Sequence, residues 1–227
     1  VTAGVRMDDH SAFGANFERI YYPKASLSYV ISDEDFFDFS FVDNLKLRAA
    51  WGRAGNAPAP FSADRTYGAA AVVMDNGSVV SSLDPDAFGN QDIRAEKGEE
   101  IEVGFDASLL DNNLGLEVTY YSSRTKDALI SVPVPASSGW VGTVLRNIGE
   151  IANSGLEVAI FGSPIRTPSL TWDATLTLST NSNEVISLGE GARDTIPVGY
   201  RNSQRHVAGY PLAGYWTQVP VRNADGS

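Results

Sequence analysis

The chain of 227 residues is acidic, with 17 Lys and Arg residues against 28 Asp and Glu residues and a formal net charge of −11. Phosphate binding needs clustered cations and the sequence has no basic run, so nucleic acid is an unsuitable partner. The absence of cysteine excludes a disulfide framework, a thiol nucleophile and a thiolate metal site. No apolar run approaches the roughly 18 residues of a membrane-spanning helix, which excludes a helical membrane protein.

Alternation of apolar and polar residues recurs along the chain, whereas helical periodicity is almost absent. In the stretch GLEVTYYSSRTKDALI, for example, Leu116, Val118 and Tyr120 alternate with Glu117 and Thr119. This pattern predicts a strand with one apolar and one polar face. The whole chain yields seven predicted strands, at residues 1–6, 21–31, 45–52, 99–109, 115–130, 154–162 and 170–180.

The connections between these strands alternate between short and long. Residues 110–113 and 163–169 form short turns, whereas residues 53–97 and 125–152 form long links, the first with a hairpin signal at Asp75-Asn76-Gly77. Transmembrane barrels have short periplasmic turns at one end and long extracellular loops at the other. Several strands are about ten residues, the length that crosses a bilayer when tilted. Residues 32–44 are long for a periplasmic turn.

Two architectures place the apolar row of each strand differently. In an outer-membrane barrel, Leu116 and Leu176 face lipid, and Glu117 and Thr177 line the lumen. In a soluble or surface-attached β-sandwich that binds glycan, the apolar row packs against a second sheet. Strand length and the alternation of loops favour the barrel. A surface enzyme with β architecture is a third alternative.

The segment RNIGEIANSGLEVAI, residues 146–160, is the most specific part of the sequence. It resembles the N-x-G-E-x-x-N-x-G-x-E segment in the barrel of SusC/RagA-type TonB-dependent outer-membrane transporters. The matching residues are Asn147, Gly149, Glu150, Asn153, Gly155 and Glu157. Other segments are similar to the family in the same order, among them VRMDDHSAFG, LKLRAAWGRAGN, NSNEVISLG and VAGYPLAGYW. The chain departs from the family pattern at Asp9, His10, Lys24 and Tyr29.

The resemblance implies an all-β fold, an antiparallel transmembrane β-barrel segment of about seven consecutive strands from a 22-stranded plugged barrel with long extracellular loops. Residues 1–227 are then expected to be part of the C-terminal β-barrel domain, with the plug domain and the final strands outside this chain. The family lies in the bacterial cell outer membrane and imports bulky nutrients, here an oligosaccharide or a peptide. The implied partners are outer-membrane lipid, a SusD-like surface lipoprotein and the TonB system, reached through the plug.

Aromatic residues supply the candidate binding sites. Those in the predicted extracellular loops are candidates for stacking on a ligand, although they also suit contacts between loops; they are Tyr67, Trp140, Tyr200, Tyr210 and Trp216. Those near strand ends, Tyr120, Tyr121 and Trp172, are expected to belong to an interfacial girdle or to packing.

Catalysis and metal binding have little support in the sequence. Glu102 and Asp106 share a strand face but lie four residues apart, about 13 Å, which is too far for direct acid–base pairing. The sequence lacks a Gly-x-Ser-x-Gly elbow, and we expect neither an enzyme nor a cofactor. His10 and His206 are expected to be solvated loop residues rather than metal ligands. Residues 84–92 are expected to form an ordinary turn-rich loop rather than a calcium site.

Overall fold

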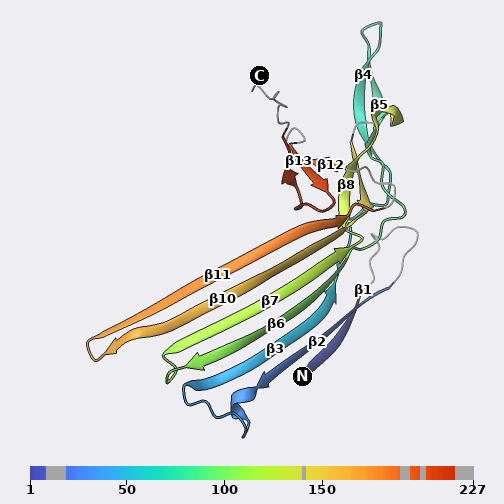
Figure 1. Ribbon diagram of the computed structural model, residues 1–227. Coiled ribbons are helices and arrows are strands. Elements are labelled where there is room, and N and C mark those ends of the chain that lie inside the picture. The colour runs from blue at the N-terminus through green and yellow to red at the C-terminus, as the bar shows by residue number, and fades with distance from the viewer. Residues whose placement is uncertain (9–18, 140–141, 190–194, 200–202, 218–227) are drawn as a thin grey trace, which may run out of the picture.

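The main body of the protein is one antiparallel sheet of seven strands (Figure 1). The computed structural model describes residues 1–8, 19–139, 142–189, 195–199 and 203–217. Each strand pairs with the one before it in the sheet, so the connectivity is a meander. The strands are β1 (Thr2–Asp8), β2 (Ile20–Val30), β3 (Val42–Ala54), β6 (Lys97–Leu109), β7 (Leu114–Lys126), β10 (Glu150–Thr167) and β11 (Leu170–Ser187). The described residues include no helix that is long and apolar enough to cross a membrane.

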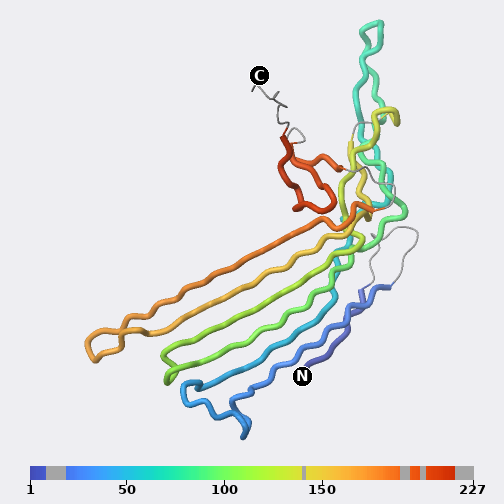
Figure 2. The backbone as a smooth tube through the Cα atoms, viewed as in Figure 1, coloured from blue at the N-terminus to red at the C-terminus, as the bar shows by residue number. Residues whose placement is uncertain are grey.

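Smaller β elements lie beyond one end of this sheet, and we call them together the loop region (Figure 2). They are the hairpins β4 (Thr66–Val73) with β5 (Val79–Ala87) and β8 (Leu129–Pro133) with β9 (Thr143–Asn147), and the sheet of β12 (Thr195–Val198), β13 (Gln204–Val207) and β14 (Gly214–Tyr215). Two single turns of 3₁₀ helix also occur, η1 (Ile31–Asp33) and η2 (Ala136–Ser138). The hairpin predicted from Asp75-Asn76-Gly77 is confirmed, and Gly77 supplies the positive φ of +79° that its turn needs.

The seven predicted strands are all present, and three details differ from the prediction. Strands β10 and β11 have 18 residues each because their hairpin continues past the start of β7 at Leu114, at the end of the sheet away from the loop region, while the other end of β11 reaches the loop region (Figure 1). The segment after β2 is not a simple turn, since it begins with the 3₁₀ turn η1. Part of the predicted loop at 84–92 is extended, because Asp84 to Ala87 complete strand β5.

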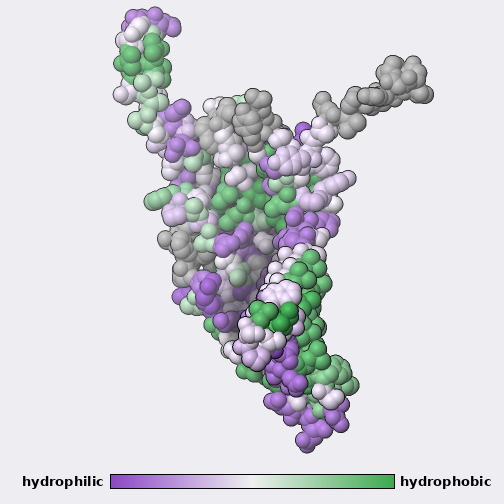
Figure 3. Space-filling view, turned by 90° about the vertical axis from the view of Figure 1, so that its left-hand side faces the viewer, coloured by the Kyte–Doolittle hydropathy of each residue, from purple (hydrophilic) through white to green (hydrophobic). Residues whose placement is uncertain are grey.

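Neighbouring strands align their apolar residues into rows on one face of the sheet. Directly paired residues of antiparallel strands point to the same face. One such row crosses six strands and contains Tyr29, Leu47, Phe105, Val118, Val158 and Leu178. Leu176 and Leu178 are 65% and 62% exposed, and no second layer covers this face in the described part of the chain (Figure 3). The β-sandwich alternative is therefore wrong.

Together these rows form an apolar band across the outward face of the sheet. The upper edge of the band, the edge nearer the loop region, is slanted relative to the rows. In β3 the last apolar residue on the outward face before the loop region is Trp51, and its row leads through β6, β7 and β10 to Ser182 in β11. In β11 the outward apolar run ends at Leu178, four residues short of Ser182, and the next outward residues, Thr180, Ser182 and Glu184, are polar. The edge of the band therefore drifts by four residues along the strand over the four strand spacings from β3 to β11. With about 3.3 Å per residue and about 4.8 Å between strands, this drift corresponds to an angle of about 35°.

The lower edge of the band has the same slant. The row that starts at Leu45 in β3 reaches Leu176 in β11, but the apolar face of β11 continues at least four residues further, through Trp172 to Leu170. Strands of transmembrane barrels are tilted by about 35–45° from the membrane normal. The slant of the apolar band therefore matches the tilt of the strands. When the strands are tilted by this angle, the band lies parallel to the membrane plane. The outward face is therefore the lipid face, and the opposite face is the lumenal face.

Candidate lumenal face and extracellular loops

A charged network lies on the lumenal face of the sheet. Asp106 accepts a hydrogen bond from Arg48 Nε at 2.8 Å, and Lys46 Nζ lies 2.6 Å from its other oxygen. Arg48 also donates to Thr119 Oγ1 at 3.1 Å. Gly104 stands between Arg48 and Thr119 in the register, and its missing side chain leaves room for the guanidinium to cross. Three adjacent strands are thereby joined by paired charges rather than by apolar contacts.

Two aromatic rings on the same face lie over glycines of the neighbouring strand. Tyr121 is paired with Gly155, and its hydroxyl accepts a hydrogen bond from Asn181 Nδ2 at 2.8 Å. Phe161 is paired with Gly115, whose missing side chain leaves the space that the ring occupies. These glycines therefore let bulky groups lie flat against the sheet.

The residues considered for the interfacial girdle divide between the two faces. Tyr120 and Trp172 lie on the lipid face and are 47% and 55% exposed. Tyr121 is adjacent to Tyr120 and therefore lies on the lumenal face, where it serves packing and hydrogen bonding. Trp51 was not selected from the sequence, yet it lies on the lipid face with its indole Nε1 donating to Glu99 Oε1 at 2.8 Å. A ring in the apolar band with a bonded polar end is typical of the membrane interface.

Asn147 connects two extracellular loops that are far apart in the sequence. Its side-chain oxygen accepts from the backbone N–H of Arg94 at 2.7 Å, and its Nδ2 donates to the carbonyl oxygens of Arg94 and Asp127 at 2.7 and 3.0 Å. Asn90 adds a further bond, from its Nδ2 to the carbonyl oxygen of Leu145 at 3.1 Å. The first residue of the N-x-G-E segment thus holds the 53–97 loop against the 125–152 loop.

Other residues of this segment also have identifiable structural roles. Gly149 has a φ of +87°, and a Cβ there would contact the backbone of Ser187, so the chain turn before β10 needs glycine. Glu150 forms an ion pair with Arg124 at 3.1 Å. The motif therefore specifies where β10 leaves the loops and enters the barrel wall.

The loop region has a small apolar core of its own. It is formed where β8, the end of β11 and β12 meet, and its buried members are Ala128, Ile130, Val185, Leu188 and Ile196. Backbone hydrogen bonds between Val185 and residues 209 and 210 attach the turn after β13 to this core. The extension of β11 beyond the membrane is thus explained by what it packs against.

His206 differs from the prediction. It lies in β13 rather than in a polar loop and is 9% exposed, so it is not a solvated residue. Its Nδ1 accepts a hydrogen bond from the backbone N–H of Ala213 at 3.1 Å, and burial lowers the pKa of its imidazole below the ordinary value. Within the described ranges, no group of three His, Cys, Asp or Glu side chains could hold a metal ion. His10 lies outside the described residues.

Among the candidate ligand-binding aromatics that the structure describes, two are in contact with each other and the third lies on a different hairpin. Tyr210 and Trp216 are neighbours, with ring centroids 4.9 Å apart and an edge-to-face angle of 72°. Tyr67 lies on β4 in the hairpin that projects from the rest of the molecule (Figure 1). Both Tyr67 and Tyr210 are about half exposed, at 54% and 51%. Trp140 and Tyr200 lie outside the described residues.

Comparison with known proteins agrees with this geometry. A family model described as TonB dependent receptor-like, beta-barrel, matches residues 1–226. The chain belongs to this TonB-dependent receptor family. The family consists of outer-membrane transporters and not of enzymes, so the slanted apolar band is the part of the wall that faces the outer-membrane lipid.

Curated relatives include TonB-dependent receptor P39 of Formosa agariphila, which is 33% identical over 197 residues, 84% of this chain and 18% of the relative. SusC of Bacteroides thetaiotaomicron is 28% identical over 242 residues, which cover 99% of this chain and 24% of SusC. The chain thus spans between 18% and 24% of the length of these curated relatives.

Solved structures share the fold. The RagAB peptide transporter matches with a TM-score of 0.80 at 23% identity, over 92% of this chain and 23% of that chain. The same importer in its closed-closed state gives a TM-score of 0.79 at 21% identity over 99% of this chain. The seven-stranded sheet and the loop region therefore follow the barrel architecture of a SusC/RagA-type receptor.

Proposed function

We propose that this chain forms barrel wall and extracellular loops of an importer that carries an oligosaccharide or a peptide across the outer membrane. TonB acts on the plug of this importer to supply energy, and a SusD-like lipoprotein covers its extracellular mouth. The observation that carries the proposal is the slanted apolar band opposite a lumenal face of paired charges and hydroxyl groups. Relatives named SusC and a RagAB peptide transporter of the same fold support it.

The loop region supports a role at the extracellular mouth. Asn147 and the small apolar core hold the loops together above the lumen, which gives a partner or a substrate a preformed surface. The edge-to-face pair of Tyr210 and Trp216 is the best candidate for stacking on a sugar ring or an aromatic peptide side chain, since both rings remain partly exposed. In this proposal Tyr67 does not take part in the Tyr210–Trp216 site and is an ordinary surface residue.

The test uses the full-length parent protein in its own outer membrane. We expect it to require detergent for extraction, to migrate differently on a gel after heating, and to co-purify with a SusD-like lipoprotein. Growth on the transported oligosaccharide or peptide as the sole nutrient is expected to stop when the gene is deleted. Recovery of the parent in soluble form from the periplasm or the medium would overturn the proposal.

Paired variants test the aromatic contact. Tyr210→Ala and Trp216→Ala are expected to reduce uptake at limiting substrate while the amount of barrel in the membrane stays constant. Tyr67→Ala is the matched control, because it removes an equally exposed ring from a different hairpin. Equal uptake by all three variants would exclude the aromatic pair from substrate binding.

A further inference from the structure

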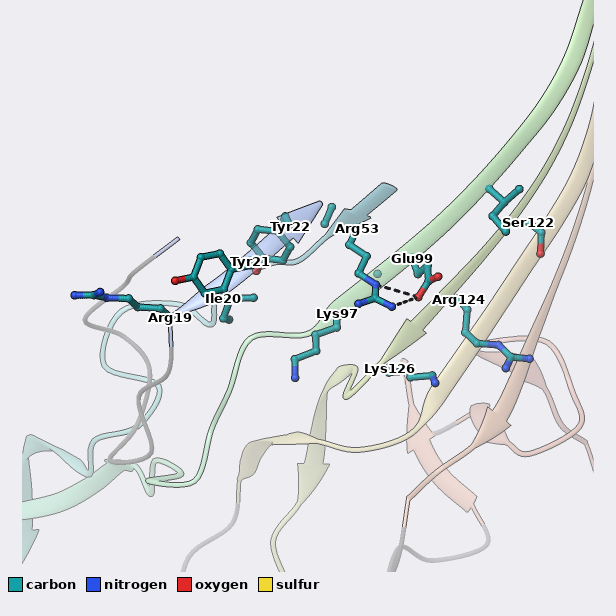
Figure 4. A pocket seen from close by; sticks show the side chains of 13 residues that line it. Arg19, Ile20, Tyr21, Tyr22, Arg53, Lys97, Glu99, Ser122, Arg124 and Lys126 are labelled. Carbon is teal, nitrogen blue, oxygen red and sulfur yellow. Dashed lines mark hydrogen bonds and ion pairs between the residues drawn. The ribbon is translucent and has the colours of Figure 1, made fainter. Parts of the chain in front are cut away.

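A basic cleft opens on the lipid face where the sheet meets the loop region (Figure 4). The pairing of β2 with β3 ends at Lys24 and Gly52, whereas β3 remains paired with β6 as far as Ala54 and Gly98. The upper part of β2 therefore separates from its neighbour and leaves a cleft of about 680 Å³. Five cations line this cleft, namely Arg19, Arg53, Lys97, Arg124 and Lys126.

This concentration of positive charge contrasts with the net charge of −11 of the whole chain. Two of the cations have acidic partners, since Arg53 pairs with Glu99 at 3.2 Å and Arg124 with Glu150 at 3.1 Å. Lys97 and Lys126 are directly opposite each other on β6 and β7. Like charges in such a pair repel each other and destabilise a sheet.

Glu150 lies directly opposite Lys126 on β10, but its ion pair is with Arg124, and neither lysine forms an ion pair in the part of the chain that the structure describes. Both lysine side chains are exposed. Figure 4 shows the two ammonium groups turned away from each other, and an anion that drew both of them toward itself would gain two charge-assisted contacts. The pair therefore carries the features of a site for an external anion rather than of an internal network like that around Asp106.

The height of the cleft identifies the source of the anion. Trp51 marks the upper edge of the apolar band, and Arg53 lies 5.5 Å over its ring. Lys97 is four residues beyond Ile101, the residue paired with Trp51, which places it about 10 Å higher along the membrane normal for a tilted strand. The head groups extend about 5–7 Å beyond the hydrocarbon, and the long lysine side chain reaches back to that level from the backbone position.

We propose that this cleft binds the phosphate of an outer-leaflet lipid head group, held mainly by Lys97 and Lys126. The apolar band directly below the cleft receives the acyl chains of the same lipid, and Ile101, the partner of Trp51, lines the cleft at the edge of the band. Soluble substrate in the lumen meets the opposite face of the sheet. Basic pockets beside membrane-spanning elements recognise anionic head groups by this combination of charge and depth.

Native mass spectrometry of the detergent-purified parent protein with added phosphorylated lipid A tests the proposal. The double variant Lys97→Gln, Lys126→Gln is expected to bind this lipid roughly tenfold or more weakly, because each lysine near an anionic surface contributes about fivefold. The charge-preserving double variant with arginine at both positions is expected to retain binding. Lys24→Gln is the matched control, since Lys24 is exposed on the lumenal face, and is expected to bind as the wild type does.

Three results would overturn the proposal. They are equal binding of phosphorylated lipid A by the glutamine double variant, equal binding of dephosphorylated lipid A by the wild type, and displacement of the lipid by an equal concentration of inorganic phosphate. The last result would assign the cleft to a free anion. Heat-modifiable migration of each variant confirms that the barrel has folded, so a loss of binding is separated from a loss of structure.

Discussion

The sheet and the loop region bury opposite kinds of side chain, and strand β11 passes through both. Leu178, in the membrane part of this strand, is 62% exposed, whereas Val185, seven residues later, is completely buried in the loop core. In the sheet the apolar side chains point outward to lipid, and Lys46 and Arg48 form ion pairs with Asp106 on the lumenal face. In the loop region a small apolar core is buried around Val185, although the β4–β5 hairpin exposes apolar side chains such as Val73 and Leu83.

This difference shows that one continuous strand can present apolar side chains to lipid along one part and bury them in a core surrounded by water along another. Every backbone group in hydrocarbon needs a partner within the protein, so the sheet depends on its complete ladder of strand pairing. The short strands of the loop region pair over only a few residues, and side-chain hydrogen bonds and a small core hold them in place. A substitution should therefore have different consequences in the two regions.

The largest effect is expected from a charge on the lipid face. Val118→Arg should block or strongly reduce barrel assembly, because arginine near the middle of the bilayer costs about 2–4 kcal/mol. Thr119→Arg places the same charge on the lumenal face one residue away and should be tolerated far better. The folded fraction after refolding into lipid vesicles, read from heat-modifiable migration, measures both. Equal tolerance would contradict the assignment of the faces.

Asn147→Ala should act on the loop region and leave the sheet intact. It removes three hydrogen bonds, each with a net value of about 1 kcal/mol, and weakens the attachment of the 53–97 loop to the 125–152 loop, which keeps the bond from Asn90 to Leu145. Hydrogen exchange of the Arg94 amide is expected to accelerate, while the amides of β6 and β7 remain protected.

Asn113→Ala is the control for this change, because the side chain of Asn113 donates to Leu110 within the short turn after β6, far from the loop region. It should leave the extracellular amides unchanged. Faster exchange throughout the sheet of the Asn147 variant would mean that the loops and the wall are one cooperative unit, contrary to the distinction drawn between them.

A smaller effect is expected on the lumenal face. Asp106→Asn leaves Lys46 and Arg48 without their shared carboxylate and should lower the free energy of unfolding by about 1–2 kcal/mol, since both contacts are partly exposed. Glu117→Gln is the matched control, because Glu117 lies directly opposite Asp106 on the same face. Removing its charge relieves repulsion between the two carboxylates, so it should be neutral or slightly stabilising. Denaturant titration in detergent compares the two variants.

The sheet could be predicted from the sequence because a period of two residues is a local property. Alternation predicted all seven strands and the face on which each residue lies. The sequence alone, for example, places Val118 and Thr119 on opposite faces of β7, as the structure does. The slant of the apolar band could not be predicted, because it depends on the register between strands, which the sequence does not display.

The loop region was less predictable because its contacts are between residues distant in the sequence. Nothing local in the sequence shows that Asn147 binds to Arg94, 53 residues away, or that the end of β11 becomes buried. The five cations of the lipid-face cleft are likewise spread over more than a hundred positions, from Arg19 to Lys126, so they form no basic run. His206 was expected to be solvated because its sequence neighbours are polar, although the chain around it folds over it.

The smallest effect is expected from the protonation of His206. Burial lowers its pKa, and its Nδ1 must be unprotonated to accept from Ala213, so the folded β12–β14 sheet binds fewer protons than the opened form. Stability of this sheet should therefore be constant above the ordinary histidine pKa of about 6.5 and fall as the pH drops below it, by at most about 1.4 kcal/mol per pH unit. Hydrogen exchange of the Ala213 amide, corrected for its intrinsic rate at each pH, measures this change. In His206→Asn, which keeps an acceptor but does not titrate, the slope should disappear; a slope that persists would assign the pH dependence to another group.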